Sequence, residues 1–371
     1  MNTGTRVGPT RSPCPSDGDG VVPGGSIRSA CAVGAAGALA LAVLGALVRH
    51  EPTPRGDDLI YEKIAQHPFG VHTFPFGYRV GLPLIVHVLP FEYTISFVAL
   101  AWLAAGGAAA FAYLLLRYLG SARAVAATLA ILMCVSPPFL LVVIRQGRNT
   151  DIATVMFLMA GSYFMVRRSY WWLGVTVLVG TPVREAVLFL LPFAYAYWAE
   201  RPFDLPAAKR TLAVGAPAVA VYLGLRLGVH TVGETRVPGY GGSIIGDRLM
   251  MIRKGLRQSS QEARRLFTIY GPLWLVSPVA LREMRFARRG LVLVALSVVS
   301  MTFAADWGRM ILLSAPVFYS AAGYVLTRKR RWRGPVFVGL GALAVAYAVY
   351  MAVHGVDSGI TNAAPPPYPV R

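Results

Sequence analysis

Long runs of apolar residues alternate with short polar segments along almost the whole chain. The runs lack the strict alternation of β-strands, and many approach the roughly 20 residues that a membrane-spanning helix needs. Because a helix satisfies its own backbone hydrogen bonds in lipid, the pattern predicts an all-α membrane protein. We expect about 11 spans, at Ser29–Val48, Tyr93–Leu116, Val125–Ile144, Ile152–Val166, Trp171–Thr181, Ala186–Trp198, Leu212–Val232, Phe267–Leu281, Leu291–Ala305, Met310–Leu326 and Val336–Val353.

The stretch 171–198 can be read as one long span or as two short helices. Pro182 and the charged pair Arg184-Glu185 interrupt its middle. Splitting the stretch places the two densest basic clusters, 282–289 and 328–333, on the cytoplasmic side, as the positive-inside rule requires. We therefore expect two short helices joined by an outward-facing turn that carries Arg184 and Glu185.

This topology divides the chain into three parts. Residues 1–28 are rich in Gly, Pro, Ser and Asp and are expected to form a disordered cytoplasmic tail. Residues 29–353 form the polytopic transmembrane domain. Residues 354–371 are expected to be a flexible extracytoplasmic tail. The chain is thus predicted to be a multi-pass protein of the cytoplasmic (inner) membrane of a bacterium, with its amino terminus inside and its carboxyl terminus outside.

Two outer loops have the pattern of amphipathic helices. In the first, Ile60 and Ile64 share one helix face, which predicts a short helix on the membrane surface. The second is Gly233–Arg265, where apolar residues follow a helical stripe and basic residues cover the rest. We interpret it as an interfacial helix that meets anionic headgroups or lipid phosphates.

The composition agrees with a membrane protein and excludes an ordinary soluble enzyme. Hydrophobic residues make up 55% of the chain and charged residues only 14%, against about 25% charged in a soluble domain. The formal net charge of +19 would suggest nucleic acid in a soluble protein, but here basic clusters between apolar spans account for much of it. We therefore expect membrane lipids as partners and no nucleic acid.

The three cysteines and the histidines show no metal-ligand spacing. We assign no metal ligands and no cofactor, and leave open whether activity needs a divalent metal.

Charged residues recur at four outward turns of the predicted topology. Ionised side chains at membrane depth cost roughly 2.5–3.5 kcal/mol each, so they tend to face a cavity and to mark function. The alternative is that each is an ordinary helix-end anchor at the headgroups. Carboxylates can take a proton from an attacking hydroxyl, and arginines can bind a phosphate through paired hydrogen bonds. The set, which suits a lipid-phosphate substrate, is Asp57, Asp58, Arg145, Arg148, Asp151, Arg184, Glu185, Asp306 and Arg309.

Several of these segments resemble GT-C-type membrane glycosyltransferases. The pair Asp57-Asp58 after the first helix looks like the acidic motif of that class, and 171–185 resembles the paired short helices of its protein mannosyltransferase-like branch. The stretches 75–80 and 306–309 also look like features of bacterial proteins of this kind. The resemblance implies a GT-C-like fold, a polyprenyl-phosphate sugar as donor, and inverting transfer to a glycan, lipid or protein acceptor on the outer face.

The resemblance also implies roles for individual residues. Asp57 or Asp58 would be the general base, with Asp57 preferred. Arg184 would be the first phosphate-binding candidate. The remaining residues of the set would bind the lipid phosphate or the rest of the substrate. Two other functions stay open, namely a lipid or glycolipid transporter (flippase) and a non-catalytic cell-envelope assembly protein.

Overall fold

The computed structural model describes residues 25–48, 57–73, 76–145, 147–232, 259–303 and 307–354. The predicted tails therefore lie almost wholly outside the described residues, as does most of the second amphipathic loop. Asp306 lies outside them too, and so do the side chains of Asp57 and Arg145.

Five helical segments among the described residues are long and apolar enough to cross a membrane. They make the chain a multi-pass membrane protein. The segment 307–328 is built from three consecutive pieces and is almost entirely covered by other helices. The five are α1 (Ile27–Gly45), α4 (Tyr93–Tyr118), α10 (Leu205–Gly228), the segment α15 (Trp307–Ile311)–η6 (Leu312–Ser314)–α16 (Ala315–Arg328), and η7 (Arg330–Trp332) continued by α17 (Arg333–His354).

A sixth span exists if a bent pair is counted as one. Helix α5 (Arg123–Cys134) is followed by α6 (Pro137–Leu140) and a π-helical turn, η2 (Leu141–Arg145). The two halves are bent by 44°. Because prolines 137 and 138 have no N–H to donate, the hydrogen bonding of α5 cannot continue through them.

The other apolar helices are shorter than a membrane is thick. The predicted break within 171–198 is present, because α8 ends at Gly180 and the next helical turn starts at Glu185. Length and composition thus support five or six spans, and the predicted count of 11 is not confirmed. The shorter helices are α7 (Asp151–Val166), α8 (Tyr170–Gly180), η3 (Glu185–Phe189) with α9 (Leu190–Trp198), and α13 (Leu273–Val276) with η4 (Ser277–Arg282). Helix α14 (Arg285–Ser300), which continues into η5 (Met301–Phe303), carries three arginines near its beginning and is not among the segments apolar enough to cross a membrane.

The predicted amphipathic segment of the first loop is helical. It forms α2 (Asp57–Gln66), which packs on α3 (Gly81–Val88). Between them, β1 (His72–Thr73) pairs in parallel with β2 (Thr231–Val232), and η1 (Phe76–Tyr78) follows. From the second loop only α12 (Ser259–Tyr270) is described.

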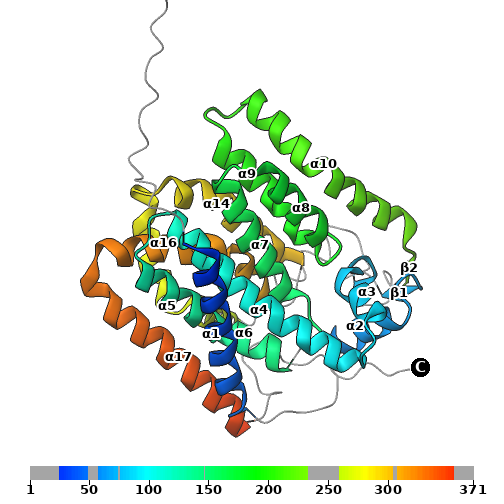
Figure 1. Ribbon diagram of the computed structural model, residues 1–371, viewed down its shortest axis with the longest axis horizontal. Helices are drawn as coiled ribbons and strands as arrows, with labels where there is room; N and C mark the ends of the chain where they lie inside the picture. The colour runs from blue at the N-terminus through cyan, green and yellow to red at the C-terminus, as the bar shows by residue number, and fades with distance from the viewer. Residues whose placement is uncertain are drawn as a thin grey trace, which may run out of the picture.

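Helix α4 is the centre of the packing. It lies between α1 and α7, while α10 covers α8 and α9 on one side and α17 covers α5 and α6 on the other (Figure 1). Helices α1 and α4 approach closely at small residues, since a Cβ on Gly34 would lie 2.6 Å from the carbonyl oxygen of Gly106. Such contacts are typical of helices that pack in lipid, where close van der Waals packing drives association.

Basic loops gather at one end of this bundle. The backbone N–H of Ala122 donates to Thr327 Oγ1 at 2.9 Å, and Arg285 donates to the carbonyl of Tyr197 at 3.2 Å. The indole of Trp198 reaches the carbonyl of Met165 at 3.2 Å. We call this region the basic end. It comprises the segments 117–123, 167–169, 200–210, 282–289 and 328–333.

Candidate functional site

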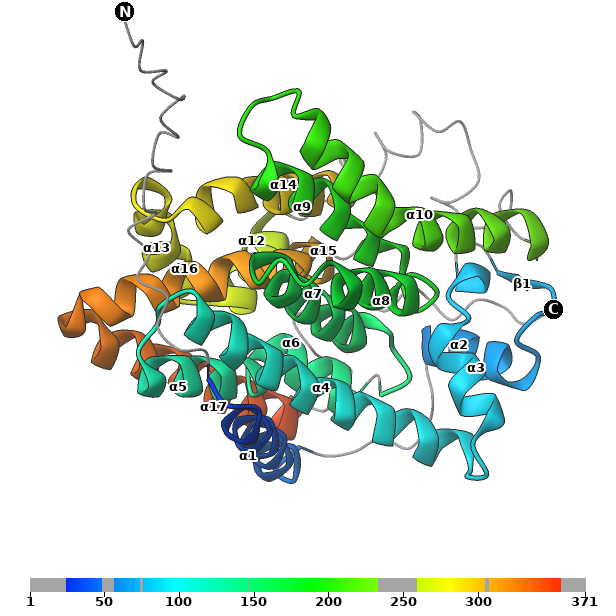
Figure 2. The same ribbon diagram turned by 45° about the horizontal axis from the view of Figure 1, so that its top comes forward.

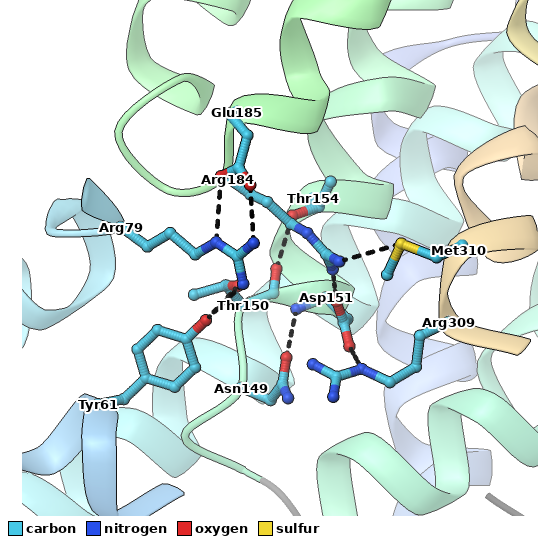
Figure 3. Close-up of polar contacts among 10 residues, drawn as sticks. All are labelled: Tyr61, Arg79, Asn149, Thr150, Asp151, Thr154, Arg184, Glu185, Arg309 and Met310. Atoms are coloured by element: carbon cyan, nitrogen blue, oxygen red, sulfur yellow. Dashed lines mark hydrogen bonds and ion pairs between the residues drawn. The ribbon is translucent and has the colours of Figure 1, made fainter. Parts of the chain in front are cut away.

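The opposite end of the bundle holds a buried network of ion pairs. Helices α2 and α3 and strand β1 group there, beside the beginning of α4 and the end of α10 (Figure 2). The network draws on α2, the segment before α3, the beginning of α7, the break between α8 and η3, and α15. We call this region the paired end. Its members, most of which Figure 3 shows, are Tyr61, Glu62, Arg79, Arg148, Asn149, Thr150, Asp151, Arg184, Glu185 and Arg309.

One carboxylate, that of Asp151, receives two guanidinium groups. Arg184 pairs with its Oδ1 atom and Arg309 pairs with its Oδ2 atom (Figure 3). The Asp151 side chain is only 2% exposed and that of Arg184 only 4%, whereas the Arg309 side chain is 18% exposed. Arg184 also contacts Met310 Sδ at 3.8 Å.

Local structure fixes the position of Asp151. The residue opens α7, where the helix dipole favours a negative charge. Its backbone N–H donates to Asn149 Oδ1 at 3.0 Å, and Thr150 accepts a bond from Thr154 through its carbonyl at 2.8 Å. The carboxylate is therefore held by the helix that carries it, while its two partners come from segments distant in the sequence.

A second ion pair lies beside the first. Arg79 donates to both oxygens of Glu185, at 2.7 and 3.1 Å, and to Tyr61 Oη at 3.3 Å. Tyr61 in turn lies 3.3 Å from Thr150 Oγ1 and so connects this pair to the beginning of α7. Burial alone would lower the pKa of the Arg79 guanidinium, but the neighbouring Glu185 carboxylate holds it above its ordinary value, so Arg79 stays charged.

A glycine brings these two segments together. The N–H of Gly81 donates to the carbonyl of Pro182 at 2.8 Å, and a Cβ on Gly81 would lie 2.8 Å from the backbone nitrogen of Val183. A residue larger than glycine at position 81 would fit only if backbone atoms of Pro182 and Val183 moved. This close approach sets Arg79, two residues before Gly81, against Glu185.

A third pair joins α2 to the loop before α7. Arg148 Nε lies 3.2 Å from Glu62 Oε2, and its Nη2 donates to Thr94 Oγ1 at 2.8 Å. Asp58 lies one turn before Glu62 and is buried, on the same side of α2 as the buried Tyr61. The paired end therefore contains at least one carboxylate of the predicted acidic motif.

The structure thus brings together Asp58, Arg148, Asp151, Arg184, Glu185 and Arg309 of the predicted set. It adds Tyr61 and Glu62, which sequence reasoning missed, and Arg79, which lies in the stretch 75–80 but was not singled out as a site residue. The signal for Arg79 was present, because it is a lone charge between apolar residues in the stretch 76–81.

No three His, Cys, Asp or Glu side chains gather as metal ligands within the described part of the chain. The chemistry that the described residues offer is that of several guanidinium groups and carboxylates held in a buried, ordered array. Arginine matches the geometry of carboxylate and phosphate oxygens with paired hydrogen bonds. An array of this kind can hold an oxyanion and stabilise charge that develops on it.

Fold and site together define a helical multi-pass membrane protein with a charged, largely buried site at one end. Comparison with known proteins finds no matching protein-family model and no matching curated protein. One similar solved structure is that of the Archaeoglobus fulgidus oligosaccharyltransferase, tethered with an acceptor peptide that contains the NVT sequon. It is 12% identical with a TM-score of 0.44, over 89% of this chain and 54% of that one, so this chain spans about half its length.

Proposed function

We propose that the protein is a glycosyltransferase that moves a sugar from a polyprenyl-phosphate donor to an acceptor hydroxyl or amide, with the paired end as its active site. One observation carries the proposal, namely that Arg184 and Arg309 meet on the two oxygens of a single buried carboxylate. Buried arginines are costly in a membrane protein and are retained where they bind an anion or line a substrate path. A lipid-linked phosphate reaches such a site from within the bilayer.

The general base is proposed to come from the acidic motif Asp57-Asp58. Asp58 supports this assignment through its place on the buried face of α2, next to Tyr61. Asp57 begins the same helix and is retained as the second candidate. Asp151 and Glu185 suit this role less well, because each already accepts from arginine. A carboxylate bound by guanidinium groups is a weaker proton acceptor.

In the proposed reaction, the acceptor oxygen or nitrogen attacks the anomeric carbon of the sugar. The base carboxylate takes the acceptor's proton as the new bond forms, and the bond from the anomeric carbon to the phosphate oxygen breaks. The electron pair leaves with the polyprenyl phosphate, whose added negative charge arginines of the paired end stabilise. Attack opposite to the leaving phosphate inverts the anomeric configuration.

We further propose that the paired end faces the outside of the cytoplasmic membrane. The support is the gathering of Lys and Arg loops at the basic end, which the positive-inside rule places in the cytoplasm. Acceptors of the proposed reaction would then be cell-envelope glycans, lipids or proteins.

The test is sugar transfer by the purified full-length protein from a panel of radiolabelled polyprenyl-phosphate sugars to a panel of envelope acceptors. Asp57→Asn and Asp58→Asn are compared with Glu200→Gln, an exposed acid at the basic end. We expect one of the two Asn variants to lose at least about 100-fold in turnover while still binding donor, consistent with loss of a general base. Glu200→Gln should keep wild-type turnover.

Donor binding without turnover by the wild-type protein, across the full acceptor panel, would contradict the proposal. Movement of the donor across vesicle membranes in the same preparation would then identify a transporter. Binding without either activity would identify a non-catalytic assembly protein.

A further inference from the structure

The carboxylate of Asp151 is an oxyanion that is shared by two arginines. Two guanidinium groups approach its two oxygens from α15 and from the α8–η3 break. A guanidinium group that pairs with a carboxylate can pair with a phosphate in the same way. We propose that the phosphate of the lipid substrate takes the place of Asp151 on Arg309, so that Arg309 binds phosphate and Arg184 is the positioning residue that holds Asp151. This inference rests on the proposed function of the paired end.

The exposed fractions of the three side chains separate these two roles. Arg184 is enclosed between Asp151 and Met310, with 4% of its side chain exposed. The Arg309 side chain is 18% exposed, so it is the more accessible of the two arginine side chains. Sequence reasoning ranked Arg184 above Arg309 as a phosphate ligand, and the burial of Arg184 argues for the reverse order.

The elements that carry the residues agree with this division. Asp151 is fixed by the beginning of α7 and by its backbone bond to Asn149. Arg309 lies near the beginning of the segment 307–328, and its side chain is more exposed than those of Asp151 and Arg184. Transfer of Arg309 from the carboxylate to a phosphate needs a rotation of one side chain and no movement of α7. The dipole of α7, which begins at Asp151, favours negative charge near this end of the helix.

The geometry implies that Asp151 competes with the ligand. Each is an oxyanion that pairs with Arg309, and binding of one releases the other. Removing the charge of Asp151 should therefore strengthen phosphate binding, although Asp151 lies at the centre of the site. A residue that simply helps to bind the ligand would have the opposite effect when removed.

The experiment measures binding of farnesyl phosphate to the full-length protein in nanodiscs by native mass spectrometry, with farnesol as the phosphate-free probe. Arg309→Gln should weaken farnesyl phosphate binding at least about tenfold and leave farnesol unchanged, because the charge-assisted bonds are lost. The matched control is Lys63→Gln, which removes an exposed positive charge from α2 at the same end. It should bind as the wild type does.

Asp151→Asn should tighten farnesyl phosphate binding severalfold. Weaker binding of farnesyl phosphate by Asp151→Asn would overturn the proposal. Wild-type affinity of Arg309→Gln for farnesyl phosphate would overturn it as well. If Asp151→Asn does not fold, Arg309→Lys decides the question. Lys keeps the charge but lacks the planar fork, so intermediate affinity is expected, whereas wild-type affinity would contradict a paired contact with phosphate.

These results are separable from the proposed function. Sugar transfer by the wild type together with unchanged phosphate binding in Arg309→Gln would refute this inference alone. Loss of phosphate binding in Arg309→Gln without sugar transfer by the wild type would refute the proposed function alone.

Discussion

The two ends of the molecule are both rich in arginine but use it differently. At the paired end, Arg79 and Arg184 are buried, and each pairs with a carboxylate. At the basic end, Arg328 lies over the ring of Tyr324 at 3.6 Å and Lys329 over that of Trp332 at 5.3 Å. Aromatic rings and headgroup-level water satisfy a cation without burying it.

This difference distinguishes residues of a proposed binding or catalytic site from residues that anchor the protein in the membrane. Exposed cations at the basic end suit orientation in the membrane and contact with anionic lipids, for which each contributes about 1 kcal/mol. Buried pairs at the paired end contribute little net stability, since desolvation offsets their attraction. Their presence in a buried region therefore supports the proposed role in binding or chemistry.

The largest expected effect is on stability and comes from breaking the Asp151 cluster. Arg184→Gln leaves a buried carboxylate without one of its two partners, which we expect to destabilise the protein by about 3–5 kcal/mol. Arg331→Gln at the exposed basic end should change stability by less than about 0.5 kcal/mol. Thermal unfolding in detergent, followed by circular dichroism, compares the two. Equal melting temperatures would contradict the burial-based distinction.

A smaller effect is expected from Gly81→Ala. The added Cβ would meet the backbone nitrogen of Val183 at 2.8 Å, so the segment before α3 must move and the pairing of Arg79 with Glu185 should weaken. We expect a lower melting temperature and at least about tenfold slower sugar transfer, since small displacements of positioned groups strongly affect rate.

The matched control is Gly341→Ala in α17, where a Cβ would meet open space. Helix propensity predicts that this change is neutral or stabilising by up to about 1 kcal/mol. If both variants behave alike, close approach at Gly81 does not position Arg79.

The orientation of the two ends can be measured directly. Single cysteines in place of Glu92, at the paired end, and Arg330, at the basic end, are introduced after the three native cysteines are changed to Ser. Both positions are exposed. A membrane-impermeant maleimide should label Glu92→Cys in intact cells and Arg330→Cys only in inverted vesicles, as the positive-inside rule requires. The reverse pattern would place the paired end in the cytoplasm.

The smallest expected effect concerns the cap of α10 at the basic end. Asp204 accepts from the N–H groups of Glu200 and Ala207, both at 3.0 Å, and these bonds hold the pKa of its carboxyl below the ordinary value of 3.8. A lowered folded-state pKa adds stability above pH 3.8, which is lost as pH falls through the folded-state value.

Asp204→Asn should therefore melt slightly below the wild type at pH 7, and the gap should close toward pH 3. A gap that widens on acidification would contradict this role of the carboxylate.

Sequence reasoning could reach much of this arrangement. Pro182 and the charges beside it predicted the break after α8, and the paired prolines lie where α5 ends. The positions of Arg148, Asp151 and Arg309 near the ends of predicted spans placed them on the outward side of the predicted topology. The number of spans was harder to predict. A short apolar run such as 151–166 does not reveal whether a helix crosses the membrane or packs inside the bundle.

The partners within the site could not be predicted. Arg309 and Asp151 are 158 positions apart, and Arg79 and Glu185 are 106 apart. Glu185 was expected to bind substrate, yet it pairs with Arg79. The close approach of Gly81 to the 182–183 turn, which local sequence does not reveal, brings that pair together.

Both proposals require that an anionic lipid substrate binds at the paired end. Photolabelling of the full-length protein with a diazirine-bearing farnesyl phosphate, followed by peptide mass spectrometry, tests it most directly. Labelled peptides are expected within 57–94, 147–151, 182–186 and 307–311, with labelling suppressed by excess farnesyl phosphate and not by farnesol. Phosphate-competed labelling confined to the basic end, within 282–289 and 328–333, would contradict it.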